Sequence, residues 1–182
     1  MYIFNLFVPF NFNFYSSLLL PPFFQGVIFV ILLIQRYYRE NRKGDIWLAG
    51  ILGLLSIRIA FWMLGFAGWY DKHNAYTTFM FYFPFNNLII AGVLLYFYFL
   101  TVTNVQFQLK KEHYKHFVLP ILWIFMIILK FVVDFTYYYP FPKIEALQYG
   151  TKGYWAELDK SLIANIVSYI TFFYYVYLTL KK

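Results

Sequence analysis

The stretch SLLLPPFFQGVIFVILLIQ, residues 17–35, decides the fold of this chain. It carries no charged side chain, and Pro21 and Pro22 fall in its opening turns, where a missing backbone N–H costs a helix least. A helix needs about 20 predominantly apolar residues to cross the hydrocarbon core of a bilayer. The stretch therefore predicts a transmembrane helix.

The remainder of the chain has the same character. Of its 182 residues, 62% are hydrophobic and only 13% are charged, whereas soluble domains are about half apolar and about a quarter charged. One soluble core of this size would not bury so much apolar surface. Further apolar runs predict spans at residues 46–64, 79–100, 117–135 and 162–180. We therefore expect an all-α membrane protein, a bundle of about five transmembrane helices over residues 17–182.

The N-terminal residues 1–16 form a different kind of segment. They lack the basic region and the small-residue cleavage site of a signal peptide, and Pro9 and three Asn make them a poor spanning helix. Phe and Tyr favour the headgroup depth of a bilayer, so we interpret the segment as interfacial. A wrongly assigned start or a frayed tail is the alternative.

The distribution of Lys and Arg predicts the orientation of the bundle. Four follow the first span, three follow the third and two end the chain, against four in total on the other side. Cytoplasmic loops carry the excess of basic residues, so the N-terminus is expected outside and the C-terminus in the cytoplasm. The net charge of +7 thus sits in short loops. That pattern indicates topology and not a nucleic-acid surface, and the expected location is the bacterial inner membrane, with the lipid bilayer as the main partner.

Polar chemistry concentrates at the predicted outer side. The segment GFAGWYDKHNAYTTFMFYFPFN, residues 65–86, joins the second and third spans, while Arg58 and Lys130 lie inside predicted spans, where a charge is costly. We predict an outer ligand-binding pocket lined by Arg58, Trp69, Tyr70, Asp71, His73, Lys130 and Asp134. The alternatives are that Lys130 extends towards water, that Arg58 pairs with a neighbouring carbonyl or carboxylate, and that the aromatic residues only mark the interface.

Three amide side chains in spans suggest contacts between helices. Gln25, Asn86 and Asn87 are candidates for hydrogen bonds across helix pairs, which contribute modestly to association in membranes. In the loop KKEHYKHF, His113 and His116 have a spacing that would suit a metal on a helix, but no third ligand is near. We interpret this loop as a solvated helix contacting anionic lipid, and expect no metal and no cofactor.

Catalysis finds no support in the sequence. The chain has no Cys, no Gly-rich phosphate loop, no HExxH and no paired carboxylates within a span, and its three His lie in loops. We therefore expect a protein that is not an enzyme.

Three segments carry a resemblance to a known family: LLLPPFFQG (18–26), RYYRENRKGDIWLAGILGLLSIRIAFWMLGFAGWYD (36–71) and AYTTFMFYFPFNNLIIAGVLLYFYF (75–99). The chain resembles the N-terminal membrane half of membrane-anchored AraC-type helix-turn-helix transcription regulators. Related membrane halves are joined to LytTR or histidine kinase modules. The family's membrane half often has about seven spans and precedes a DNA-binding domain; this sequence departs on both points, which suggests a fragment.

The resemblance implies a membrane-embedded sensory or anchor domain of a signal-responsive transcription regulator. Its expected partners are an outside small-molecule signal and a second copy of the chain, and it would contact no nucleic acid itself. The alternative is a small multi-pass transporter or channel component.

Overall fold

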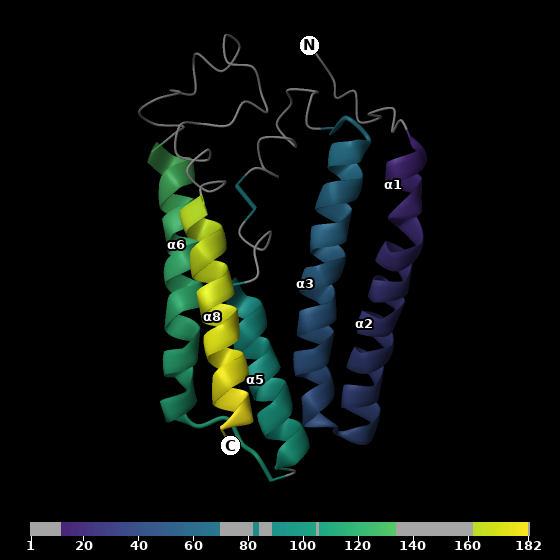
Figure 1. The fold of residues 1–182 in the computed structure, drawn as a ribbon. Helices are drawn as coiled ribbons and strands as arrows, with labels where there is room; N and C mark the ends of the chain where they lie inside the picture. Colours follow the sequence, from purple (N-terminus) through teal and green to yellow (C-terminus); the bar gives the residue numbers. More distant parts are fainter. Residues whose placement is uncertain (1–11, 70–81, 84–88, 105, 134–161, 182) are drawn as a thin grey trace, which may run out of the picture.

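The computed structural model describes residues 12–69, 82–83, 89–104, 106–133 and 162–181 (Figure 1). All regular secondary structure in these ranges is helical, so the predicted all-α class is confirmed for this part of the chain. The elements in chain order are α1 (Phe14–Leu18), α2 (Leu20–Glu40), α3 (Lys43–Phe66), α5 (Ile89–Thr103), the 3-10 helix η3 (Lys111–Phe117), α6 (Val118–Val133) and α8 (Leu162–Leu180).

The helices lie side by side as a bundle (Figure 1). α1 continues into α2, and η3 runs directly into α6, so the described chain forms five rods. α3 packs against α2 and against α5, and α5 also packs against α8. α3 and α5 therefore lie at the centre of the arrangement: α3 packs on α2 on one side, and α5 packs on α8 on the other.

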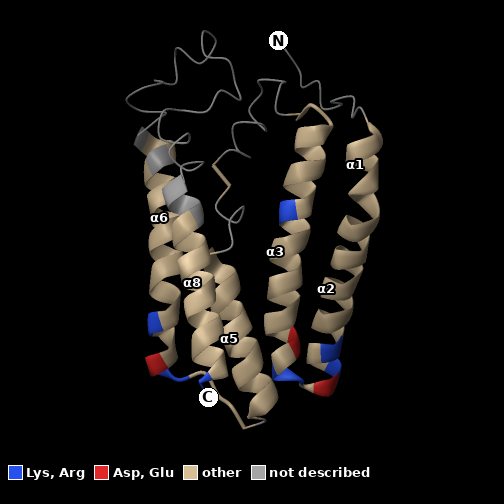
Figure 2. Ribbon diagram, in the orientation of Figure 1, with Lys and Arg blue, Asp and Glu red and all other residues tan. Residues whose placement is uncertain are grey.

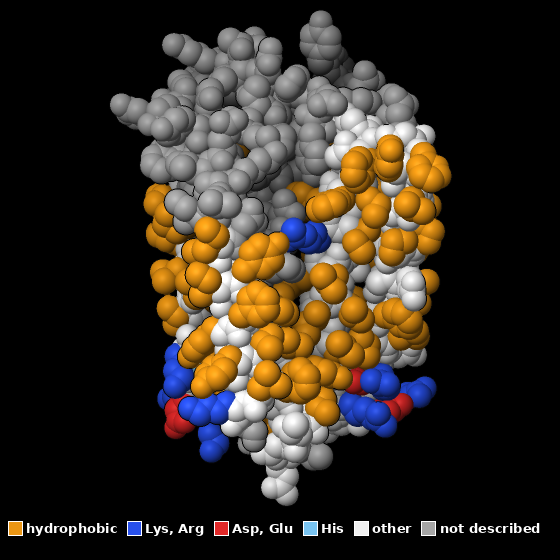
Figure 3. Space-filling model, viewed as in Figure 1, with side chains coloured by type: hydrophobic (Ala, Val, Ile, Leu, Met, Phe, Trp, Pro, Cys, Tyr) orange, Lys and Arg blue, Asp and Glu red, His pale blue; other side chains and the backbone are white. Residues whose placement is uncertain are grey.

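Three of the rods are long and apolar enough to cross a membrane: Phe14–Glu40, Lys43–Phe66 and Lys111–Leu129. The other two provide shorter apolar helices, Ile89–Thr103 and Ile166–Leu180. Hydrophobic side chains cover much of the face shown in Figure 3, with the charged side chains gathered mainly below them. A hydrophobic outer surface on helices of this length is what a bilayer solvates.

The third predicted span, residues 79–100, differs from the structure. Tyr82 and Phe83 are not helical, and the described helix α5, Ile89–Thr103, continues beyond the predicted end at residue 100. Phe83 precedes Pro84 in the sequence, and a proline ring disfavours the helical conformation of the residue before it. The prediction that Tyr82 and Phe83 belong to a helix is therefore wrong, because hydrophobicity alone does not determine where a helix begins.

The first hairpin has defined ends. Asn13 caps α1, since its side chain accepts the Ser16 N–H while the Ser16 hydroxyl accepts the Asn13 N–H. Helix therefore begins at Phe14, ahead of the predicted start of the span. The Asn13 side-chain amide also donates to the Phe66 carbonyl, which ties the start of α1 to the end of α3. At the other end α2 stops at Asn41, whose left-handed backbone (φ 53°) is one that Asn tolerates better than most residues.

Small residues set the distance between α2 and α3. A Cβ atom added at Gly26 would lie 2.2 Å from the Ser56 Oγ and 3.4 Å from the Ser56 Cβ. Ser56 is buried, and its hydroxyl donates to the Leu52 carbonyl at 2.8 Å. Close approach of this kind is how helices associate in lipid, where the hydrophobic effect between them is absent.

Gly26→Ala should therefore destabilise the hairpin by about 1 kcal/mol, because the Ser56 hydroxyl has to turn out of its place. The double variant Gly26→Ala/Ser56→Ala removes the colliding oxygen and leaves an ordinary contact between two Cβ atoms. It should recover most of the stability, measured as unfolding by sodium dodecyl sulfate in mixed micelles and followed by circular dichroism. An equal loss in the single and double variants would contradict this account of the contact.

Candidate functional site

The predicted outer pocket is described only in part. Arg58 lies half-buried on α3, and Trp69 lies half-buried just beyond the end of that helix. Tyr70, Asp71, His73 and Asp134, and the side chain of Lys130, lie outside what the structure describes. No hydrogen bond or ion pair joins the Arg58 side chain to another described residue. The proposal that these groups line one pocket stays a prediction.

The predicted polar contacts between helices are also described only in part. Asn86 and Asn87 lie outside the described ranges. Gln25 is exposed on α2, and the close contact at this level of the hairpin is made by its neighbour Gly26.

Charged side chains gather at one end of the bundle, which we call the charged end (Figure 2). It comprises the end of α2, the start of α3, η3 and the end of α8. Its described charged residues are Arg36, Arg39, Glu40, Arg42, Lys43, Asp45, Lys110, Lys111, Glu112, Lys115 and Lys181. The other two charged residues in the described ranges lie within helices, Arg58 in α3 and Lys130 in α6. Charge is thus separated along the helices as it is across a membrane interface.

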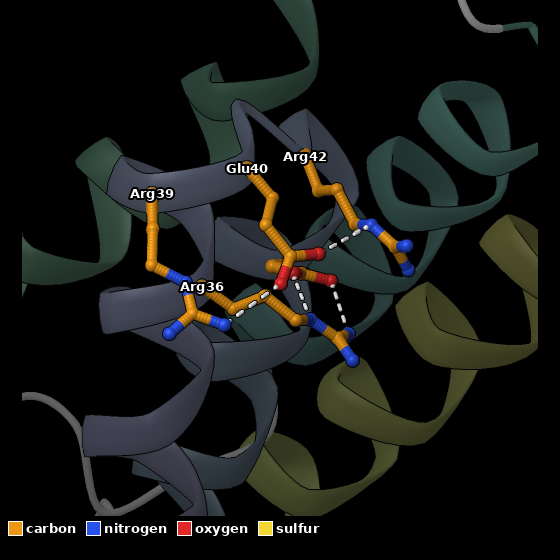
Figure 4. Close-up of polar contacts among 5 residues, drawn as sticks. Arg36, Arg39, Glu40 and Arg42 are labelled. Carbon is orange, nitrogen blue, oxygen red and sulfur yellow. Dashed lines mark hydrogen bonds and ion pairs between the residues drawn. The ribbon is translucent and has the colours of Figure 1, made fainter.

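Two acidic residues of the charged end are held by arginines (Figure 4). The Arg36 Nε and one terminal guanidinium nitrogen donate to the two Asp45 carboxylate oxygens at 2.5 and 2.7 Å. Glu40 accepts from Arg42 at 3.0 Å and from Arg39 at 3.3 Å. The Asp45 side chain is only 8% exposed, whereas that of Arg36 is 42% exposed. Without Arg36, the Asp45 carboxylate would therefore be a buried charge with little access to water, which is unfavourable.

Arg36 and Asp45 lie just outside the predicted spans 17–35 and 46–64. The hydrogen bonds from the Arg36 guanidinium hold the pKa of Asp45 below its ordinary value. A carboxylate with a lowered pKa stabilises the fold above the ordinary Asp pKa of about 4, and this contribution disappears as the pH falls through the pKa of the folded state. The bidentate geometry also fixes the end of α2 against the start of α3.

Asp45→Asn should lower the thermal midpoint at pH 7 and leave it less sensitive to acid between about pH 5 and pH 3 than that of the unaltered chain. The reason is that Asn cannot titrate and cannot attract the guanidinium as a charge. Glu112→Gln is the matched control, because Glu112 is exposed on η3 and forms no ion pair with another described residue. Equal midpoints for Asp45→Asn and the unaltered chain at pH 7 would contradict a stabilising role for the pair.

Next to these charges lies an aromatic cluster centred on Phe97 of α5, which is 0% exposed. Its ring stacks on Trp47 of α3 with the centroids 5.0 Å apart, and on Phe117 at the end of η3 at 5.3 Å with an interplanar angle of 4°. We call this group the Phe97 cluster. It consists of Trp47, Val93, Tyr96, Phe97, Leu100, Phe107, Phe117, Tyr175 and Leu178. It therefore joins α3, α5, η3 and α8 in one packed unit.

The two histidines of η3 face this cluster. The His113 and His116 rings meet Phe97 edge to face, with centroids 5.9 and 5.8 Å away. A 3-10 helix has three residues per turn, so side chains three apart fall on the same face. Both His are half-buried, whereas Lys111 and Lys115 are exposed. The prediction that this helix is solvated is thus wrong for its histidine face, and the predicted lipid contact stays a prediction.

Tyr175 brings α8 into the same unit. Its hydroxyl oxygen lies 3.2 Å from the His116 Nδ1 and donates to the His116 carbonyl at 3.3 Å. Both contacts form together when the His116 Nδ1 carries the proton and donates to the hydroxyl. Tyr175 is buried at 7% exposure, and its ring also contacts Tyr96. A displacement of α8 would therefore break contacts with both η3 and α5.

The described charged end offers ion pairs, hydrogen bonds and ring contacts. Within the residues that the structure describes, no group of three or more His, Cys, Asp or Glu side chains could hold a metal ion. Comparison with protein-family models, curated proteins and solved structures finds no match to this chain.

Proposed function

We propose that the chain is a membrane-embedded sensory or anchor domain of a signal-responsive transcription regulator in the bacterial inner membrane. In this proposal five helices cross the bilayer, the N-terminus is outside and the charged end lies in the cytoplasm. The observation that carries it is the gathering of the described Lys and Arg at one end of an otherwise apolar bundle (Figure 2). An excess of basic residues on one side is the main determinant of membrane orientation.

The proposed mechanism is a shift between two arrangements of the bundle. A signal that binds the outer side better in one arrangement, or a change in bilayer stress, would favour that arrangement. The Phe97 cluster is suited to pass such a change to α8, because Tyr175 contacts His116 and Tyr96 directly. Arg58, half-buried on α3, is the described candidate for a polar contact on the signal side.

The rival proposal, a transporter or channel component, has less support. A conduit needs polar groups or a water-filled path through the bundle. Close to the charged end, the space between α3, α5, η3 and α8 is instead filled by the Phe97 cluster, whose central ring is fully buried. The packing there favours a domain that transmits a change of shape over one that passes a solute.

The orientation is tested by labelling intact cells with a membrane-impermeant amine reagent. We expect Lys72, in the predicted outer loop, to be labelled and Lys111 of η3 to react only after the cells are opened. The variants Lys72→Arg and Lys111→Arg are the controls, since each removes one reactive amine and keeps the charge. Labelling of Lys111 but not Lys72 in intact cells would reject the orientation and with it the sensing proposal.

The sensing proposal itself is tested by measuring distances between two labels at the charged end. The chain has no Cys, so Tyr38→Cys and Leu180→Cys, both at exposed positions, give two unique spin-label sites on α2 and α8. In phosphatidylcholine bilayers of short and long acyl chains we expect two distances whose populations exchange with thickness. If a single distance is observed and it is the same in every bilayer, the sensing role is rejected and only the role of a membrane anchor remains.

A further inference from the structure

The outward face of η3 presents positive charge from a fixed position. Its inner face is held by the edge-to-face contacts of His113 and His116 with Phe97. The His113 Nδ1 also accepts the Lys110 backbone N–H at 2.9 Å, which fixes the start of the 3-10 turn. Lys110, Lys111 and Lys115 are left exposed. Lys111 and Lys115 thus lie on a short helix whose inner face is held in place, and Lys110 directly precedes it.

The neighbours of η3 place these lysines at the boundary between apolar surface and water. Leu109, just before them, is 40% exposed, and Val118, which follows η3, is 51% exposed. From Val118 onwards most side chains of α6 are hydrophobic and exposed, which is the surface that acyl chains cover. Tyr114, 57% exposed on η3, is a residue type favoured at that boundary. In a bilayer that covers the apolar surface of α6, the lysines would therefore lie at the depth of phospholipid headgroups.

The acidic residues nearby do not neutralise this face. At the charged end eight described Lys or Arg stand against three Asp or Glu, so the net charge of this set is +5. Asp45 and Glu40 are paired with arginines of the α2–α3 hairpin. Glu112, exposed on η3 itself, offsets one of the charges of Lys110, Lys111 and Lys115 and leaves an excess of two positive charges there. Among the described residues, none of the ion pairs involves Lys110, Lys111 or Lys115. Their charge is free to attract an anion from outside the chain.

We propose that the outward face of η3 is a binding surface for anionic phospholipid, in which Lys110, Lys111 and Lys115 hold the headgroup phosphate. Basic residues next to a membrane span attract anionic headgroups, and each adds to the affinity. The exposed hydrophobic residues on both sides select a lipid over a soluble anion, because the acyl chains of a bound lipid would cover α6. The inference requires only that the bundle lies in a bilayer; it does not depend on sensing or on orientation.

The test is lipid retention by the purified full chain from micelles containing equal amounts of phosphatidylglycerol and phosphatidylcholine, read by native mass spectrometry. We expect the unaltered chain to retain phosphatidylglycerol preferentially. Lys111→Gln/Lys115→Gln should reduce the ratio of retained phosphatidylglycerol to phosphatidylcholine by about tenfold, and Lys111→Gln alone by about threefold. Lys111→Arg/Lys115→Arg should keep the ratio within about twofold, because it keeps both charges.

The matched control is Arg39→Gln/Arg42→Gln, which removes two positive charges from the same end of the bundle but from groups that are paired with Glu40. It should change the ratio by less than about twofold. Equal losses in the lysine and arginine variants would mean diffuse attraction and overturn the proposal, as would the absence of any preference in the unaltered chain. Displacement of phosphatidylglycerol by millimolar glycerol phosphate would point to a soluble anion and also overturn it. Unchanged helicity of each variant shows that the fold is retained.

Discussion

Phe97→Ala should lower the free energy of unfolding by about 3 kcal/mol, the lower end of the range for buried aromatic residues. Phe97 is 0% exposed and is enclosed by Trp47, Phe117 and the two imidazoles of η3. Truncation would leave a cavity where α3, α5 and η3 meet, and the stacked rings would lose their central partner. The lower end applies because part of the usual cost, transfer of the ring to water, is reduced when the unfolded helix stays in lipid or detergent.

Phe99→Ala is the matched control for this prediction. Phe99 lies on the same helix two residues further on, and its side chain is 41% exposed. It contacts only Tyr98 among the ring pairs of the described chain, so its loss should cost less than about 1 kcal/mol. Both variants are compared by unfolding in mixed micelles with increasing sodium dodecyl sulfate, followed by circular dichroism. Similar costs for the two substitutions would show that the Phe97 cluster is not the packed centre of the bundle.

The sequence was sufficient to predict where most helices lie. Residues 17–35 and 46–64 fall within α1–α2 and α3, because an apolar run of this length has few structural options besides a helix. The error around Tyr82 has a local cause, since Pro84 acts on backbone conformation while leaving the hydrophobicity of the run unchanged. Hydrophobic patterning thus predicted helix positions well and helix boundaries less well.

The Phe97 cluster could not be predicted in the same way. Its members come from α3, α5, η3 and α8, and nothing in their local sequence distinguishes a ring that faces another helix from one that faces lipid. Both kinds of position are apolar in a membrane protein, so the contrast that identifies a soluble core is missing. The three-residue spacing of His113 and His116 was the one available signal. It indicated a shared face, but not that this face would contact Phe97.

Gly92 is the second position where we expect a large effect. A Cβ atom added there would lie 3.1 Å from the Cα of Phe172 and 3.2 Å from the Tyr175 ring. The Cα belongs to the backbone of α8, so α8 itself would have to move, whereas at Gly26 only a hydroxyl has to turn. Gly92→Val should therefore cost about 2 to 3 kcal/mol, and Gly92→Ala about 1 to 2 kcal/mol.

Whether a Gly→Ala substitution raises or lowers the free energy of unfolding depends on two opposing effects, the gain in helix propensity and the collision of the added methyl group. Replacing Gly by Ala inside a helix stabilises the helix by about 0.5 to 1 kcal/mol, since Gly loses more backbone freedom on folding. At Gly53 of α3 the added Cβ would meet only Val30 Cγ2, at 4.0 Å, which is an ordinary contact. Gly53→Ala should therefore be neutral or stabilising, while at Gly92 the collision with α8 outweighs the gain in helix propensity.

The two alanine variants can be separated further by a measurement that reports on α8 directly. Tyr175 contacts His116 only while α8 keeps its place beside α5, so displacement of the helix should break the hydrogen bond between them. We expect the imidazole resonances of His116 to shift in Gly92→Ala and to stay unchanged in Gly53→Ala, with Tyr175→Phe as the reference for a broken contact. If Gly92→Ala leaves both the His116 resonances and the stability unchanged, α5 and α8 are not held together by backbone contact at Gly92, and the route from α8 to η3 through Tyr175 loses its support.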